Sequence, residues 1–182
     1  MRRSKLITRS EVLPVNLSVI KEHLGIYHDE KNHNLTILMS AATNIAEKFT
    51  GQIFRVGGDI YEQSLEGFPD RVQLDYSPAT GIISVKYFDG AGTEQTLPTG
   101  SYEFVDFITP QQVVFKNTPD TTAREGAVKI RYVAGFKLSS EVPTDVKSAI
   151  LLITQYLYDN PGDAVRQMPT ASEYILRNYK VL

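Results

Sequence analysis

The chain contains no cysteine, and this absence excludes several kinds of protein at once. Without cysteine there are no disulfide bonds, no thiolate nucleophile and no cysteine metal site, so packing must stabilise the fold. The longest apolar run is too short to cross a bilayer, which needs about 20 apolar residues, so we expect no membrane partner. A net charge of −2 gives no overall reason to expect nucleic-acid binding. With 42% apolar residues, the chain can nevertheless bury a real core.

Recognisable catalytic patterns are scarce as well. The three histidines are spaced by five residues, which would turn neighbours about 140° apart on a helix and makes a poor metal site. No serine lies in a Gly-x-Ser-x-Gly context. One enzyme alternative stays open, a polysaccharide-active site built from acidic side chains of the middle region. Those side chains are Glu62, Glu66, Asp70 and Asp75. We expect them and the nearby Asp59 to be solvated, and hence a protein that is no enzyme and uses no metal or cofactor.

Residues 1–51 are predicted to form a helical hairpin. The first helix follows Asn16, a residue suited to the N-cap, and stops at Gly25. The second begins near Asp29 and carries apolar residues on one face until it ends at Thr50-Gly51. A DNA-reading helix-turn-helix would have the same outline, but the positions of the second helix expected to face outward lack arginine. Those positions are Thr36, Ser40, Asn44 and Glu47. Before the hairpin, residues 1–10 carry only basic charges, which predicts a flexible basic tail.

Between residues 52 and 136 the apolar pattern changes to a period of two, which indicates about six short antiparallel strands. Their sequences are RVQLDY, IISVKYF, EQTL, SYEFV, QVVF and AVKIRYVAG. The Asp-Gly-Ala-Gly turn at residues 89–92 is the clearest hairpin signal, because glycine accepts the positive φ of a tight connection. Strands inserted between helices predict an α+β fold, here one domain over residues 1–182.

The last region, residues 140–182, holds an apolar helix, a Pro161-Gly162 break and a short terminal helical tail. The helix, expected over residues 140–160, has a broad core-facing stripe. Leu151 and Tyr158 lie nearly opposite that stripe and form a second ridge, which either the same chain or a neighbouring subunit must cover. The tail at residues 161–182 is too short to be a stable helix by itself, so it needs a surface, on its own domain or on a partner.

Segments in a fixed order resemble the head-tail connector, or adaptor, family of tailed bacteriophages across residues 12–182. The segments are PVNLSVIKEHLGI, EKFTGQ, LEGFPD, DGAGTEQTL, VPTDVKSAILL and YILRNYKVL. This resemblance implies a structural protein of the virion neck, assembled in the host cytoplasm. Such proteins form a ring, usually dodecameric, that lies below the portal protein, extends the DNA channel and completes the head. A stopper or tail-completion protein binds the far side, and packaged DNA is contacted at most without specificity.

The resemblance also assigns interaction residues. It implies that the terminal segment reaches the portal through Arg166, Tyr174, Ile175, Leu176, Tyr179 and Leu182. The ridge of Leu151 and Tyr158 is then the expected contact between subunits. Exposed strand edges and the loops at residues 89–92 and 118–125 are expected to meet neighbouring subunits or the next neck protein. Two alternatives remain, a head-closure or tail-terminator protein of the same neck, which would be richer in strands, and a DNA-binding regulator.

Overall fold

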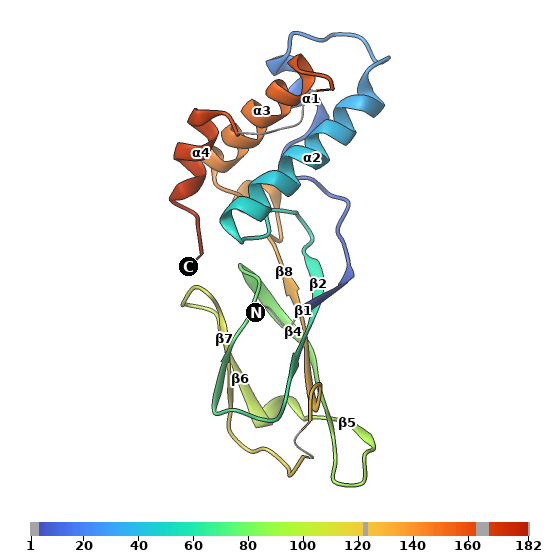
Figure 1. Ribbon diagram of the computed structural model, residues 1–182, viewed down its shortest axis with the longest axis vertical. Coiled ribbons are helices and arrows are strands. Elements are labelled where there is room, and N and C mark those ends of the chain that lie inside the picture. The colour runs from blue at the N-terminus through green and yellow to red at the C-terminus, as the bar shows by residue number, and fades with distance from the viewer. Residues whose placement is uncertain (1–3, 122–123, 163–167, 182) are drawn as a thin grey trace. The chain divides into compact units, whose positions relative to one another are not determined.

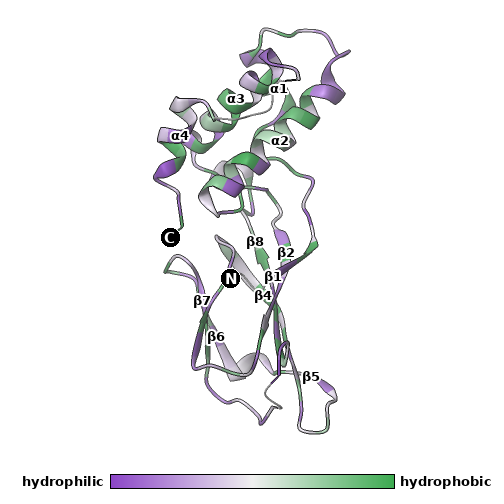
Figure 2. Cartoon of the chain, viewed as in Figure 1, coloured by the Kyte–Doolittle hydropathy of each residue, from purple (hydrophilic) through white to green (hydrophobic). Residues whose placement is uncertain are grey.

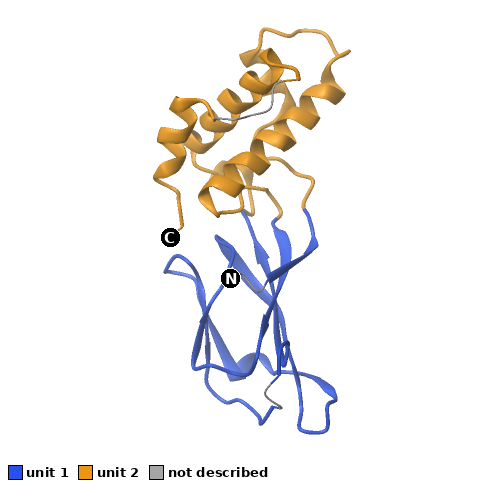
Figure 3. Cartoon of the chain, in the orientation of Figure 1, with its two compact units in different colours: residues 1–9, 58–135 blue, residues 10–57, 136–182 orange. Residues whose placement is uncertain are grey.

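The computed structural model of the chain describes residues 4–121, 124–162 and 168–181. It divides into two units, each assembled from separate stretches of sequence (Figure 3). The β unit comprises residues 1–9 and 58–135, and the helical unit comprises residues 10–57 and 136–182. The chain therefore passes between the units three times, and the predicted β region at residues 52–136 corresponds closely to the long segment of the β unit.

The β unit contains two antiparallel sheets (Figure 1). The first has the order β1-β2-β8-β4-β5, with β1 Ser4–Thr8, β2 Asp59–Leu65, β8 Val128–Ala134, β4 Ala79–Phe88 and β5 Glu94–Thr96. The second has the order β3-β7-β6, with β3 Arg71–Gln73, β7 Gln112–Phe115 and β6 Tyr102–Val105, and a 3-10 turn at Thr99–Ser101 precedes β6. The expected α+β class and all six predicted strands are confirmed.

Alternating burial explains why the sequence of β8 forms a strand. Val128, Ile130 and Tyr132 are fully buried, whereas the intervening Lys129 and Arg131 remain half-exposed. One sheet face is therefore dry and the other is solvated, as expected of an antiparallel sheet covered on one side. On the buried face the Tyr132 hydroxyl accepts a hydrogen bond from the Tyr76 N–H (3.1 Å), which lies in the segment between β3 and β4. Burial raises the pKa of Tyr132.

Two strands were not predicted, and both change the interpretation of residues near them. Ser4–Thr8 pairs with β2 as an edge strand, so the expectation of a flexible basic tail is wrong for these residues. Its partner lies more than 50 residues away along the chain, and local sequence patterns do not show such pairings. In β2, Asp59 is 0% exposed rather than solvated, and the Arg9 guanidinium lies 3.5 Å from its carboxylate.

The described residues of the helical unit form four helices, which are α1 Leu17–His23, α2 Asn32–Thr50, α3 Thr144–Asp159 and α4 Thr170–Arg177. The predicted end of α2 is confirmed, because Gly51 adopts a left-handed φ of 76° and caps the helix. The predicted start is wrong by one turn. Asp29 does not cap α2, because its carboxylate accepts hydrogen bonds from Lys21 Nζ (2.7 Å) and Asn32 Nδ2 (3.1 Å). The connection between α1 and α2 correspondingly extends over residues 24–31.

One apolar cluster forms the core of the helical unit, with α3 against both α2 and α4. Figure 2 shows the apolar colouring concentrated on α2 and α3. The predicted core stripe of α3 is confirmed at its first four positions, Val146, Ala149, Ile150 and Ile153, each no more than 1% exposed. None of the helices in the described part of the chain is both long and apolar enough to span a membrane.

Candidate assembly interfaces

The second ridge of α3 is only partly open. Leu151 is half-buried and packs against the apolar cluster of the helical unit. Tyr158 is also half-buried, and its hydroxyl accepts a hydrogen bond from Lys31, whose ammonium lies 5.0 Å from the centre of the tyrosine ring. Other residues of the same chain thus cover part of this ridge. Tyr158 nevertheless remains partly exposed on this ridge.

The helix α4 is docked on α3 of the same subunit. Leu176 is 0% exposed within the apolar cluster, and the buried Ser172 hydroxyl donates to the Ala149 carbonyl (3.2 Å). The expectation that Leu176 anchors the portal therefore needs correction, because its side chain fills the subunit's own core. The surface that this short helix requires is supplied by α3.

Residues after α4 are held to the same subunit by polar contacts. The Tyr179 hydroxyl donates to the Asp145 carboxylate at the start of α3, with O···O distances of 2.7 and 2.8 Å. The backbone of Val181 donates to the Thr50 carbonyl (2.8 Å), and Gln52 Nε2 donates to the Tyr179 carbonyl (2.6 Å). Burial, with a further contribution from the Asp145 hydrogen bond, raises the pKa of Tyr179 to about 12.

The outer face of α4 is the exposed part of the predicted portal contact. Tyr174 is 77% exposed, whereas Ile175 is half-buried against the apolar cluster. Arg177 is exposed beside it and forms an ion pair with Glu173 one turn earlier (2.7 Å). Of the remaining predicted portal residues, Arg166 and Leu182 lie outside the described residues.

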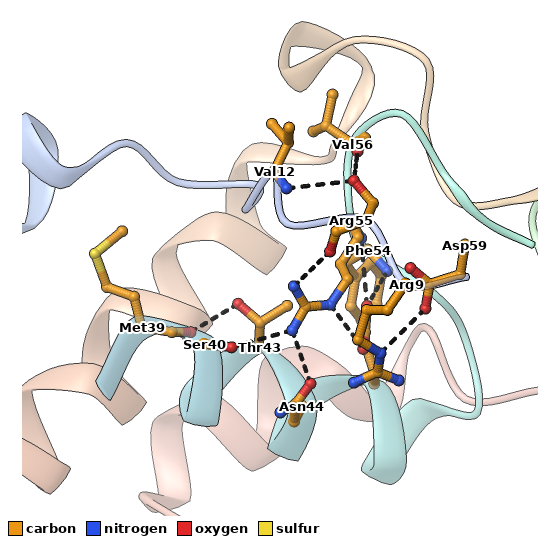
Figure 4. A network of polar contacts seen from close by, with 12 residues as sticks. Arg9, Val12, Met39, Ser40, Thr43, Asn44, Phe54, Arg55, Val56 and Asp59 are labelled. Atoms are coloured by element: carbon orange, nitrogen blue, oxygen red, sulfur yellow. Dashed lines mark hydrogen bonds and ion pairs between the residues drawn. The ribbon is translucent and has the colours of Figure 1, made fainter. Parts of the chain in front are cut away.

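A buried polar network at the end of α2 was not predicted (Figure 4). Glu47 and Arg55 are 6% and 3% exposed, and Arg55 Nε lies 3.9 Å from the Glu47 carboxylate. The other Glu47 oxygen accepts the N–H groups of Phe54 (2.9 Å) and Arg55 (3.3 Å). The guanidinium also donates to Ser40 Oγ (3.1 Å) and Asn44 Oδ1 (3.0 Å) on α2. The network fixes the segment after α2 against the helix, and so corrects the expectation that Glu47 points outward.

The four acidic residues considered for a polysaccharide-active site do not line the hollow that the structure contains in the β unit. A hollow of about 590 Å³ lies in the β unit and contains none of the four carboxylates. Its lining comprises Tyr87, Leu97, Pro98, Ser101, Lys116, Asn117, Thr118 and Pro119. Glu62 instead pairs with Arg131 (2.7 Å), and Asp75 accepts a hydrogen bond from Ser4 (2.7 Å). Within the described residues, no group of three or more possible ligands is placed to hold a metal ion.

Solved structures with the same architecture come from virus-like particles. The chain aligns with the neck of an empty gene transfer agent (GTA) particle solved with C6 symmetry, at 17% identity and a TM-score of 0.77, over 98% of this chain and 95% of that one. The neck of a native GTA particle solved with C12 symmetry gives 18% identity and a TM-score of 0.74, over 98% and 96%. This chain has the fold of a virion neck protein.

The neck fold extends over both units, because the alignments include nearly every residue. A chain in the virion of a native GTA particle shows it as well, at 16% identity and a TM-score of 0.75, over 98% of this chain and 95% of that one. No protein-family model and no curated protein matches the sequence. The neck fold confirms the resemblance that the order of sequence segments indicated.

Proposed function

We propose that this protein is a structural subunit of a virion neck, where copies form a ring that continues the DNA channel. The portal protein lies on one side of the ring and a stopper or tail-completion protein on the other. The observation that carries the proposal is the neck fold over 98% of the chain, shared with a neck solved with C12 symmetry. The role is mechanical and electrostatic, and requires neither a reaction nor a cofactor.

The portal contact in this proposal lies on the outer face of α4. Tyr174 offers a large aromatic surface that the subunit itself leaves 77% exposed, and tyrosine is among the residues that contribute most to binding. Ile175 and Tyr179 flank it with partly exposed apolar surface. Leu176 supports this face from below instead of contacting the portal. Arg177 adds a charge that improves orientation and association rate more than affinity.

The contact between adjacent copies in this proposal includes the ridge of α3. Leu151 is already packed inward, so Tyr158 contributes the larger outward surface. Its hydroxyl and ring are held by Lys31, which fixes the side chain before association. A fixed side chain loses little conformational freedom on binding, and this preorganisation favours a specific contact.

Two features argue against the alternatives. A head-closure or tail-terminator protein was expected to be richer in strands and without three substantial helices, whereas the described residues of this chain form four helices, of 7, 19, 16 and 8 residues, that make up a separate unit. A DNA-reading hairpin would need free polar side chains along α2. Ser40 and Asn44 are instead hydrogen-bonded to the buried Arg55 guanidinium.

Deletion of the gene for this chain in particle-producing cells tests the proposal. Heads should then lose packaged DNA and fail to join tails, and the native chain supplied in trans should restore both, with a ring visible at the neck by cryo-electron microscopy. Tailed particles that retain DNA without the chain would contradict the proposed function.

A pair of tyrosine variants tests the portal surface. Tyr174→Ala should weaken binding of the full chain to the portal by about tenfold or more, as expected for a central aromatic contact. Tyr27→Ala is the matched control, because Tyr27 is 88% exposed in the same unit but lies between α1 and α2. Equal effects of the two variants would remove α4 from the portal contact.

A further inference from the structure

The five-stranded sheet of the β unit has two unlike open edges (Figure 1). On one side, β1 pairs with β2 alone among the described residues, and its side chains from Lys5 to Thr8 are exposed. On the other side, β5 pairs only with Lys86, Tyr87 and Phe88 of the ten-residue strand β4. Residues 80–84 of β4 therefore have no strand beside them on the side away from β8, within the part of the chain that the structure describes.

The open stretch of β4 is bounded at both ends. Before it, the Ala79 N–H donates to the side chain of Gln111 (3.0 Å), and after it the Val85 carbonyl accepts the Leu97 N–H (2.8 Å). These two contacts provide partners for the Ala79 N–H and the Val85 carbonyl, so neither group needs a further strand. Between them, the backbone groups of residues 80–84 that point away from β8 have no such cover among the described residues.

The two open edges match in length and character. Strand β1 has five residues, and the gap at residues 80–84 also has five. Each exposes an isoleucine, Ile7 at 39% and Ile83 at 48%. Residues 80–84 have the sequence TGIIS and carry neither charge nor proline, two of the features that protect free edges of natural sheets, although their pairing with β8 shifts register twice. An uncovered edge with exposed apolar side chains is suited to accept an added strand, through main-chain hydrogen bonds and apolar contacts.

We propose that β1 of one copy adds to residues 80–84 of β4 in the next copy around the neck ring. The inference rests on the proposed function, because a ring of identical copies needs two different surfaces that complement each other on every copy. The two edges meet this requirement, since β2 and β8 separate them and one copy can use both at once. The added strand joins the five-stranded sheets of neighbouring copies into one continuous sheet.

An engineered disulfide tests the pairing directly, because the native chain has no cysteine to confuse the result. Ile7→Cys and Ile83→Cys are introduced together in the full chain, and purified particles are oxidised and analysed on a non-reducing gel. Within one copy the two positions are separated by three strand spacings, about 14 Å, whereas a disulfide requires Cα atoms within about 7 Å. Any disulfide between them must therefore link two copies.

The expected result is a ladder of covalent dimers, trimers and larger species, with each single-cysteine variant remaining monomeric on the gel. The matched control replaces Ile83→Cys by Ile37→Cys, since Ile37 is 52% exposed but lies on α2, outside both sheets. This control pair should give no ladder. In a second test, Ile7→Lys should reduce incorporation of the chain into necks at least tenfold, whereas Ile37→Lys should not.

The outcomes separate this inference from the proposed function. Necks that contain the Ile7→Cys and Ile83→Cys chain as a ring, yet show no ladder after oxidation, would overturn the strand pairing and leave the neck role intact. Absence of the native chain from necks would overturn both.

Discussion

The side chain of Leu176 provides the clearest test of how α4 is held. The substitution Leu176→Ala removes a side chain that is 0% exposed in the apolar cluster of the helical unit. Truncation of a buried leucine to alanine costs about 2–5 kcal/mol, the larger values applying where the cavity cannot collapse. Leu176 lies between α4 and α3 near the end of the chain, where the short α4 can shift to fill part of the space. We therefore expect a loss near the middle of the range, about 3 kcal/mol.

The assay is urea unfolding of the full chain, followed by circular dichroism at a wavelength dominated by helices. The matched control is Tyr174→Ala, two residues earlier on the same helix, where the side chain is 77% exposed. Substitution of such a surface residue should change the free energy of unfolding by no more than about 0.5 kcal/mol. Equal losses for the two variants would show that α4 is not part of the core, and that a partner must supply the surface that this helix needs.

Three further predictions concern the polar network, the ridge of α3 and the terminal tyrosine. Glu47→Ala leaves the buried arginine without its charge partner and should destabilise the protein by about 3–5 kcal/mol in the same assay, whereas the exposed Lys48→Ala should have little effect. Tyr158→Ala should abolish rings in electron micrographs while helical content is retained, because it removes the aromatic surface proposed to contact the next copy and spares the inward packing of Leu151. The raised pKa of Tyr179, about 12 against an ordinary 10.0, means that the stability linked to its hydroxyl is complete below pH 10 and is lost as the pH rises towards 12. The native protein should therefore lose more stability over that interval than Tyr179→Phe, as measured by thermal unfolding, and parallel losses would contradict the assignment.

The sequence was sufficient to predict elements whose stabilising contacts are local or periodic. The strand at Val128–Ala134 alternates buried and half-exposed residues, and α3 carries a continuous stripe of core residues, so both were predicted with the correct type. The edge strand β1 was missed because the basic charges spread over residues 1–10 suggested a flexible tail, and its partner β2 lies more than 50 residues later. Pairing of this kind depends on the folded topology rather than on the pattern within the strand.

The buried Glu47 and Arg55 show a second limit. On a helical wheel Glu47 falls outside the apolar face of α2, so the sequence places it in solvent. In the folded chain, the segment after α2 turns back over that position, and the Phe54 and Arg55 N–H groups donate hydrogen bonds to the Glu47 carboxylate. A polar residue is stable there because the fold supplies hydrogen bonds for it. Only the path of the following loop reveals this, and no residue type in the sequence marks it.

The predicted portal residues are divided between two surfaces for a related reason. Tyr174 and Leu176 are two positions apart, so on a helix they lie about 200° from each other and cannot share one contact surface. The sequence indicated that the tail needs a surface, but both its own domain and a partner satisfied that requirement. In the structure Leu176 faces α3 and Tyr174 remains exposed, which divides the predicted set between the core and the outside.

The complete burial of the Leu176 side chain also decides which face of α4 can bind a portal. Binding through its buried face would require the helix to leave α3, which exposes a fully buried leucine at a cost of about 1.5–3 kcal/mol. It would also break the hydrogen bonds of Ser172 and Tyr179, each contributing about 0.5–1.5 kcal/mol. Binding through Tyr174 requires neither loss. We therefore expect the amides of residues 172–177 to be protected from exchange in the free protein and to remain so in the complex with the portal, as followed by hydrogen-deuterium exchange. A gain of exchange in this segment on portal binding would show that α4 undocks, and the contact would then use the face that contains Leu176.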